Sequence, residues 1–103
     1  MNEHEIKAAL AGIPLGGLRF FQSTRSTNDE ALDWAASGAK DVSLVMADEQ
    51  TAGRGRAGRQ WFTPPGTALA FSVILRPTAD ERAFPARITG LAALALIQAC
   101  QEF

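Results

Sequence analysis

The sequence predicts a mixed α/β (α+β) fold in which helices flank a small mixed sheet. Two apolar runs rich in β-prone residues, 42–47 and 68–75, have the length of buried strands. Helical periodicity precedes the first run over 27–37 and follows the second over 86–102. Because these elements alternate along only 103 residues, we expect one domain, 1–103, with a modest core.

Before the first buried strand, local signals predict a helix, a strand and a second helix. The first helix is expected over 3–11 and the short strand over 18–21. At the start of the second helix, Thr27 and Glu30 have the spacing of a capping box, and Ser26 with the residue three positions on is a weaker candidate.

A polar linker is predicted over 78–84, and Pro85 then suits the first turn of the final helix. This helix carries a wide apolar stripe, formed by Ile88, Leu91, Ala92, Ala95, Leu96 and Ala99. We therefore expect the helix to be largely buried. Cys100, on the same helix, is expected to be a small buried hydrophobe.

Composition limits the classes of protein that the chain can belong to. Its hydrophobic fraction of 47% and charged fraction of 20% are ordinary for a globular protein, and a net charge of −1 argues against coating nucleic acid. A single cysteine gives no disulfide framework, which fits a reducing cytoplasm. The start lacks the features of a signal peptide, and the longest apolar run, 91–97, is too short to cross a bilayer. A cytoplasmic location is therefore expected.

The most informative segment is 50–61, which combines glycines, arginines and no acid. It contains Gly53, Arg54, Gly55, Arg56, Gly58 and Arg59, followed by Trp61. The glycines formally match a dinucleotide-binding fingerprint, but no strand runs directly into them and Pro64-Pro65 follows where a helix should begin. No P-loop sequence is present either.

Three interpretations of this segment remain open from the residues alone. Backbone N–H groups and guanidinium groups could wrap an anion such as a phosphate. The segment could instead be a solvated basic loop. It could also bind single-stranded nucleic acid, with Trp61 and Phe62 as stacking platforms, although the net charge disfavours this.

Other polar candidates have a structural alternative beside a functional one. Ser26-Thr27-Asn28 could be no more than a helix cap, or could form one wall of a ligand pocket at a helix N-terminus. Asp48-Glu49-Gln50 is expected to be a solvated strand end rather than a metal site, because adjacent side chains on a strand point apart. Trp34 is expected in the core, and His4 is expected to have no special role.

In order and spacing, these segments resemble the catalytic domain of biotin–protein ligases, whose fold is related to class II aminoacyl-tRNA synthetases. The resemblance rests on Ser26-Thr27-Asn28 opening a helix, on 50–66, and on the strand 69–75 that ends in Arg76-Pro77. It covers roughly 20–103 and implies a partial catalytic domain without a DNA-binding domain. The family's Lys-Trp-Pro-Asn-Asp motif and its later catalytic lysine are expected beyond Phe103.

The resemblance also implies roles for particular residues. The biotin pocket would be formed by Ser26, Thr27, Asn28 and Gln50, with Gly53, Arg54, Gly55 and Arg56 around the biotin carboxylate and the phosphate. The adenylate or ATP would be bound by Arg54, Arg56, Arg59 and Trp61. Ala57 stands where some relatives have another arginine, so this segment carries one charge fewer.

The implied activity is ATP-dependent ligation. Biotin and ATP, with Mg²⁺, would form biotinyl-5′-AMP, and a lysine of a carboxylase's biotin-carrier domain would then accept the biotinyl group. The 103-residue chain alone is expected to have little or no activity. The alternatives are a lipoate–protein ligase, whose Arg-Ser-Gly-Gly loop this chain lacks, and a non-catalytic ligand-binding or interaction module.

Overall fold

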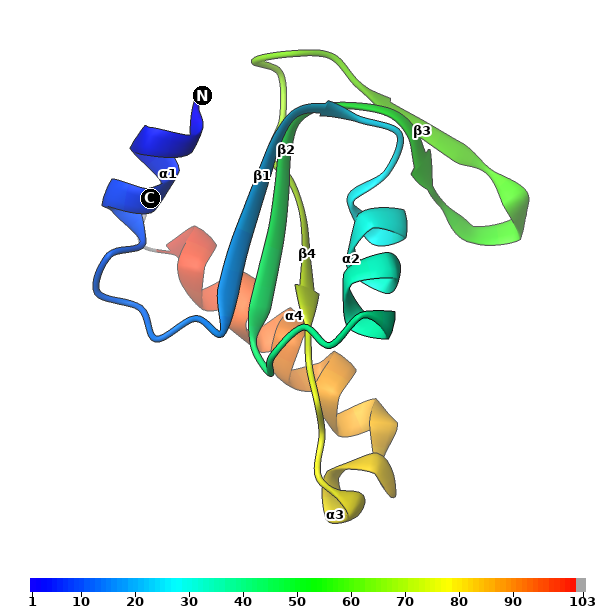
Figure 1. The fold of residues 1–103 in the computed structure, drawn as a ribbon. Coiled ribbons are helices and arrows are strands. Elements are labelled where there is room, and N and C mark those ends of the chain that lie inside the picture. Colours follow the sequence, from blue (N-terminus) through cyan, green and yellow to red (C-terminus); the bar gives the residue numbers. More distant parts are fainter. Residues whose placement is uncertain (102–103) are drawn as a thin grey trace.

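The structure, a computed structural model, describes residues 1–101 and contains a four-stranded mixed sheet with helices on both faces (Figure 1). The first half of the chain forms α1 (Glu3–Ala9), β1 (Gly17–Thr24), α2 (Thr27–Ala36) and β2 (Ser43–Arg54). The second half forms a 3₁₀ turn η1 (Arg56–Gly58), β3 (Gln60–Thr63), β4 (Ala70–Ile74), α3 (Ala79–Arg82) and α4 (Pro85–Gln101). The expected mixed α/β class is confirmed.

The long strand β2 organises the sheet. β1 runs parallel to it on one side, with Phe20 opposite Met46. On the other side β4 lies antiparallel to the first half of β2, pairing Met46 with Phe71, and β3 lies antiparallel to its last residues. Because β3 and β4 share one edge of the same strand, the end of β2 projects with β3 beyond the rest of the sheet (Figure 1).

One face of the sheet is covered by α2, and the core lies between them. Val45 of β2 and Ile74 of β4 are buried against Ala31 and Ala39, and Trp34 packs at the edge of this cluster. This placement agrees with the core position expected for Trp34. The ring of Trp34 also lies under the guanidinium of Arg19, whose Cζ is 4.3 Å from the ring centroid.

The helix α2 begins one residue earlier than the stronger sequence signal suggests. Its N-cap is Ser26, whose hydroxyl accepts the backbone N–H of Asp29 at 3.3 Å. Glu30, the expected capping partner of Thr27, instead accepts a hydrogen bond from the hydroxyl of Thr24 at 2.9 Å. Both candidates have the same spacing, so the tertiary position of Thr24 decides between them.

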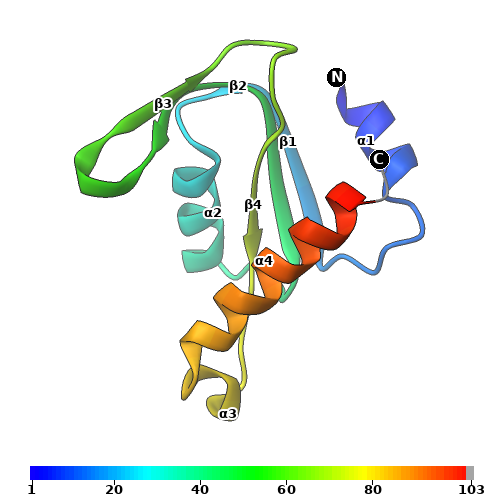
Figure 2. The ribbon, with the colours of Figure 1, turned by 180° about the vertical axis from the view of Figure 1, so that it is seen from behind.

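The expectation that the last helix is buried is wrong. Figure 2 shows α4 crossing the sheet on the face opposite α2, yet Leu91 is 66% exposed and Ile97 is 55% exposed. A cavity of about 460 Å³ separates α4 from the outward side chains of β4, among them Val73. Cys100 is exposed as well, not buried. Periodicity identifies the face that a helix would bury, but not whether the described chain supplies enough surface to cover it.

The region 78–84, expected to be a linker, contains the short helix α3. A complete capping box begins it: the hydroxyl of Thr78 accepts the N–H of Glu81, and the Glu81 carboxylate accepts the N–H of Thr78. These hydrogen bonds, the backbone N–H of Thr78 first, lower the pKa of Glu81. Among residues 1–101, no helix is long and apolar enough to span a membrane.

Candidate ligand-binding site

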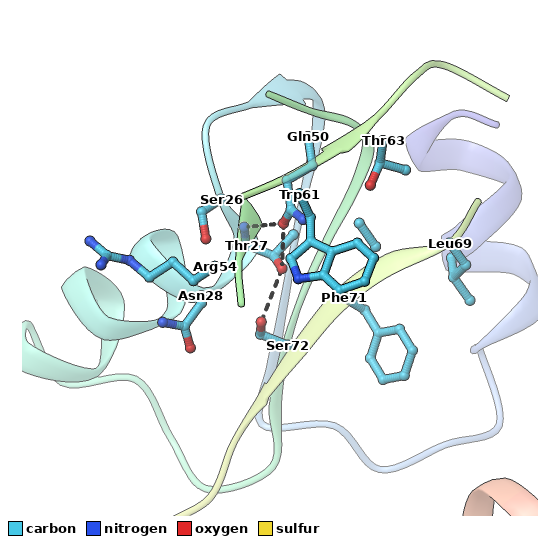
Figure 3. Close-up of a pocket in the computed structure, with 11 residues that line it drawn as sticks. Ser26, Thr27, Asn28, Gln50, Arg54, Trp61, Thr63, Leu69, Phe71 and Ser72 are labelled. Carbon is cyan, nitrogen blue, oxygen red and sulfur yellow. Dashed lines mark hydrogen bonds between the residues drawn. The ribbon is translucent and has the colours of Figure 1, made fainter. Parts of the chain in front are cut away.

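A cavity of about 410 Å³ lies where the N-terminus of α2 meets β2, β3 and β4 (Figure 3). Its volume is in the range of small-molecule sites. Its lining residues are Ser26, Thr27, Asn28, Gln50, Arg54, Trp61, Thr63, Leu69, Ala70, Phe71 and Ser72. Segments separated by more than forty residues in the sequence, Ser26 and Ser72, therefore share one site.

The polar side of the cavity is a connected set of hydrogen bonds around Thr27. The Oε1 atom of Gln50 accepts both the backbone N–H of Thr27, at 2.8 Å, and its hydroxyl, at 3.1 Å. The same hydroxyl lies 3.0 Å from Oγ of Ser72 (Figure 3). Because Thr27 is the first residue of α2, its N–H has no partner within the helix, and Gln50 satisfies it.

A β-bulge places Gln50 under the cavity. Gln50 pairs with Thr63 and Gly53 pairs with Trp61, so β2 carries one residue more than β3 between these pairs. Within the bulge, Ala52 donates its N–H to the carbonyl of Arg25 at 2.6 Å. This bond ties β2 to the turn that precedes α2, and thereby holds the two polar elements of the site together.

Two glycines are required by close contacts with the site. A Cβ atom at Gly53 would collide with Nε2 of Gln50 and lie 3.1 Å from Cβ of Trp61. A Cβ at Gly55 would collide with the indole Nε1 of Trp61. Neither glycine lines the cavity, but both allow the side chains that line it to occupy their positions.

The glycine-arginine segment is a β-hairpin rather than a free loop. β2 continues through Arg54, and Gly55 donates its N–H to the carbonyl of Arg59 at 2.8 Å to close the turn. At the tip, Ala57 and Gly58 have φ values of 58° and 73°, as a tight reversal requires. The expectation that a buried strand ends at Ala47 was therefore too short, because small residues continue the pairing.

The arginines of the hairpin do not all reach the same place. Arg54 lines the main cavity, and its Nε donates to Oδ1 of Asp29 in the first turn of α2. Arg59 does not line the main cavity but lines a smaller one of about 220 Å³, which Arg54 and Arg25 also line. Arg56 is exposed in η1 at the tip of the hairpin. Of the ten residues proposed from the sequence, the structure brings Ser26, Thr27, Asn28, Gln50, Arg54 and Trp61 around the main cavity; Gly53, Gly55, Arg56 and Arg59 lie outside its lining.

Asp48 is not the solvated residue that its sequence neighbours suggest. Its side chain is buried within β2 and accepts the backbone N–H of Gly66 at 3.1 Å. It therefore braces the turn between β3 and β4, the strands on either side of the cavity. Within residues 1–101, no group of three or more His, Cys, Asp and Glu side chains could hold a metal ion.

Sequence reasoning missed the contribution of β4 to the site. Ala70 and Ser72, on the α2 side of that strand, line the cavity, and so do Leu69, Phe71 and Thr63. Ser72 is the one polar residue in an otherwise apolar strand. A lone hydroxyl in a predicted buried strand is a signal that could have indicated it.

The resulting site joins neutral polar groups to apolar walls. Its hydroxyl and amide groups suit a polar, uncharged ligand group, and Leu69 and the exposed ring of Trp61 suit an apolar one. One guanidinium, that of Arg54, lies at the edge, already paired with Asp29. Such a site can hold a small amphipathic molecule and place an anionic end near Arg54.

Comparison with known proteins shows the family of the chain. Residues 20–103 match the model of the biotin/lipoate A/B protein ligase family. The chain belongs to this family, and the resemblance to biotin–protein ligases expected from its motifs is confirmed.

Two curated relatives show how similar the chain is to known biotin ligases and how much of their length it spans. The chain is 37% identical over 103 residues to the bifunctional ligase/repressor BirA of Bacillus subtilis, which covers 99% of this chain and 31% of that protein. It is 46% identical over 76 residues to the biotin–[acetyl-CoA-carboxylase] ligase of Paracoccus denitrificans, covering 74% and 30%. The chain thus spans less than a third of the curated relatives that it matches.

A solved structure also resembles the fold. It is the biotin acetyl coenzyme A carboxylase synthetase of Helicobacter pylori with bound biotinylated ATP, at a TM-score of 0.51 and 32% identity. The match covers 58% of this chain and 29% of that one. The expected ligase-type catalytic fold is therefore confirmed for the matched part.

Proposed function

We propose that this chain carries the biotin-binding and adenylate-forming elements of a biotin–protein ligase. The observation that carries the proposal is the single cavity formed by Ser26, Thr27, Asn28 and Gln50 with Arg54 at its edge. Biotin combines a neutral ureido group, an apolar ring and chain, and a terminal carboxylate. These three parts correspond to the neutral polar side, the apolar walls and the guanidinium of this site.

In the first step, the biotin carboxylate attacks the α-phosphorus of ATP. A P–O bond forms to the carboxylate, the bond to the bridging oxygen breaks, and pyrophosphate leaves. Two anions must approach each other, so guanidinium groups nearby lower the barrier by offsetting their repulsion. We assign this role to Arg54, Arg56 and Arg59, with Trp61 packing against the adenine. Mg²⁺ would arrive with the nucleotide phosphates.

In the second step, the amine of a lysine on a carboxylase's biotin-carrier domain attacks the acyl carbon of biotinyl-5′-AMP. An amide bond forms, the bond from the acyl carbon to the phosphate oxygen breaks, AMP leaves, and the amine nitrogen gives up one proton to solvent. Gly53, Gly55 and the hairpin that they belong to would cover the mixed anhydride and keep water from it.

Calorimetric titration of the 103-residue chain with biotin and with lipoate tests the proposal. We expect biotin to bind and lipoate not to bind, because the neutral donors and acceptors of the site suit a ureido group and lipoate has none. Binding of lipoate in preference to biotin would instead indicate a lipoate–protein ligase. Binding of neither would favour a non-catalytic interaction module and would overturn the proposal.

A further inference from the structure

The hydrogen bonds below the cavity can be given a direction, because one donor among them is unambiguous. The backbone N–H of Thr27 can only donate, so the atom of Gln50 that lies 2.8 Å from it must be the acceptor Oε1. The hydroxyl of Thr27 lies 3.1 Å from the same oxygen, which cannot donate. The single proton of that hydroxyl is therefore directed to Gln50.

The direction of the next bond follows from this. Having given its proton to Gln50, the Thr27 hydroxyl can only accept from Ser72, whose Oγ is 3.0 Å away. Ser72 therefore donates to Thr27, and Thr27 donates to Gln50. Because Thr27 is buried, water does not readily replace a donor that is removed from this series of hydrogen bonds.

This series of hydrogen bonds ends at the amide nitrogen of Gln50. With Oε1 held by two donors, Nε2 is turned away from α2 and lies against Gly53, where a Cβ atom would collide with it. Because Gln50 lines the cavity, its N–H donors are available to an acceptor oxygen of the ligand, such as a carbonyl. A flipped amide would place N–H against the backbone N–H of Thr27 and lose that bond, and the Thr27 hydroxyl would then have to accept rather than donate.

We infer that Ser72 is a positioning residue for ligand recognition, which acts by holding the Thr27 hydroxyl where it donates to Gln50. This bond adds to the one from the Thr27 backbone N–H and makes the Gln50 amide more rigid. This role of Ser72 rests on the proposed function, since the ligand oxygen is taken to be that of biotin. Ser72 need not touch the ligand to act in this way. Its position on β4 makes that strand part of the recognition apparatus rather than only part of the sheet.

The first test needs no ligand. In the intact chain, Ser72→Ala should shift or broaden the side-chain amide signals of Gln50 in a ¹⁵N NMR spectrum, while Ser72→Thr, which keeps a hydroxyl, should retain them. The matched control is Ser23→Ala, which removes an exposed hydroxyl of β1 that donates to Glu49 of β2. Unchanged Gln50 signals in Ser72→Ala would overturn the inference, whether or not biotin binds.

The second test measures biotin affinity by calorimetry. Ser72→Ala removes one neutral hydrogen bond, from Ser72 to Thr27, and should weaken biotin binding about three- to tenfold. Ser72→Thr should restore the affinity. Thr27→Val already breaks the hydrogen-bond relay from Ser72 through Thr27 to Gln50. In that background Ser72→Ala should therefore cause no further loss of biotin affinity. A loss that persists in that background would show direct contact with the ligand and overturn the positioning role. A lowered melting temperature with unchanged affinity would do the same.

The two proposals can fail separately. If the unmodified chain binds no biotin but Ser72→Ala still disturbs the Gln50 amide, the proposed function fails and the hydrogen-bond relay stands. If biotin binds and Ser72→Ala changes neither the amide signals nor the affinity, the relay fails and the proposed function stands.

Discussion

Arg54 and Asp29 form an ion pair that joins the hairpin to the first turn of α2. Nε of Arg54 donates to Oδ1 of Asp29, with the arginine side chain 66% exposed and the aspartate 35% exposed. An exposed pair of this kind contributes up to about 1 kcal/mol. The pair therefore costs little to break, and it partly neutralises the guanidinium that lines the cavity.

We predict that Asp29→Asn raises the affinity for ATP. Freeing Arg54 from a pair worth ~0.5–1 kcal/mol corresponds to about a two- to fivefold tighter Kd at low salt. The matched control is Asp33→Asn, the same change further along α2. Equal affinities for the two variants in a titration at low ionic strength would contradict a role for Arg54 at the phosphate.

Gly53→Ala should destabilise the site because no room exists for a methyl group between Gln50 and Trp61. Overpacking of this kind costs ~1–3 kcal/mol in the free energy of unfolding, measurable in urea. At Gly12 a Cβ would meet nothing within 4 Å, so Gly12→Ala should be neutral or slightly stabilising. Similar unfolding midpoints for both variants would count against the close approach described above.

Arg56→Gly should speed the escape of biotinyl-5′-AMP from protein that has formed it. Loss of a charge-assisted hydrogen bond to the phosphate corresponds to about a tenfold faster release or more. Because Arg56 is exposed, the same variant should change stability by less than about 0.5 kcal/mol. Arg82→Ala on α3 serves as the control for loss of a positive charge. Release rates that match the unmodified protein would remove Arg56 from the proposed site.

Arg76→Ala should destabilise the end of α2. Its guanidinium donates to the carbonyl of Ala39 at 2.9 Å and to that of Ala35 at 2.7 Å. One side chain that follows β4 therefore binds one acceptor in the last turn of α2 and one just beyond the helix. We expect a loss of ~1–2 kcal/mol in urea unfolding. Arg76→Lys should recover only part of it, because an ammonium lacks the fork that reaches both oxygens. Full recovery in the lysine variant would mean that charge alone matters there.

The pKa of Glu81 should lie below its ordinary value of 4.5, because the backbone N–H and the hydroxyl of Thr78 both stabilise the carboxylate. A group whose pKa is depressed on folding adds stability above its unfolded pKa and loses it as the pH falls through the folded value. A ¹³C carboxyl titration by NMR should show this midpoint. Thr78→Ala should move the midpoint upward, and no change in that variant would contradict the capping box.

Sequence patterns predicted the strands and helices well where a single periodicity dominated. The runs around Val45 and Ile74 became the central strands, and Pro85 does begin α4. Sequence patterns did not predict the short polar elements α3 and β3, which depend on contacts with other parts of the chain. The helix at Thr78 and the strand at Trp61 each contain four residues, too few for a period to be visible.

The sequence by itself determined the chemistry of this protein: the neutral groups of Ser26-Thr27-Asn28 and Gln50, the arginines after them, and through their spacing the ligase family. These features are local, since they depend on residue type and order. The tertiary structure alone decided which of them meet. It set Arg54 beside Asp29 and Ser72 behind Thr27, and it left α4 exposed, because contacts between distant segments depend on sheet register and on the surface available to cover each helix.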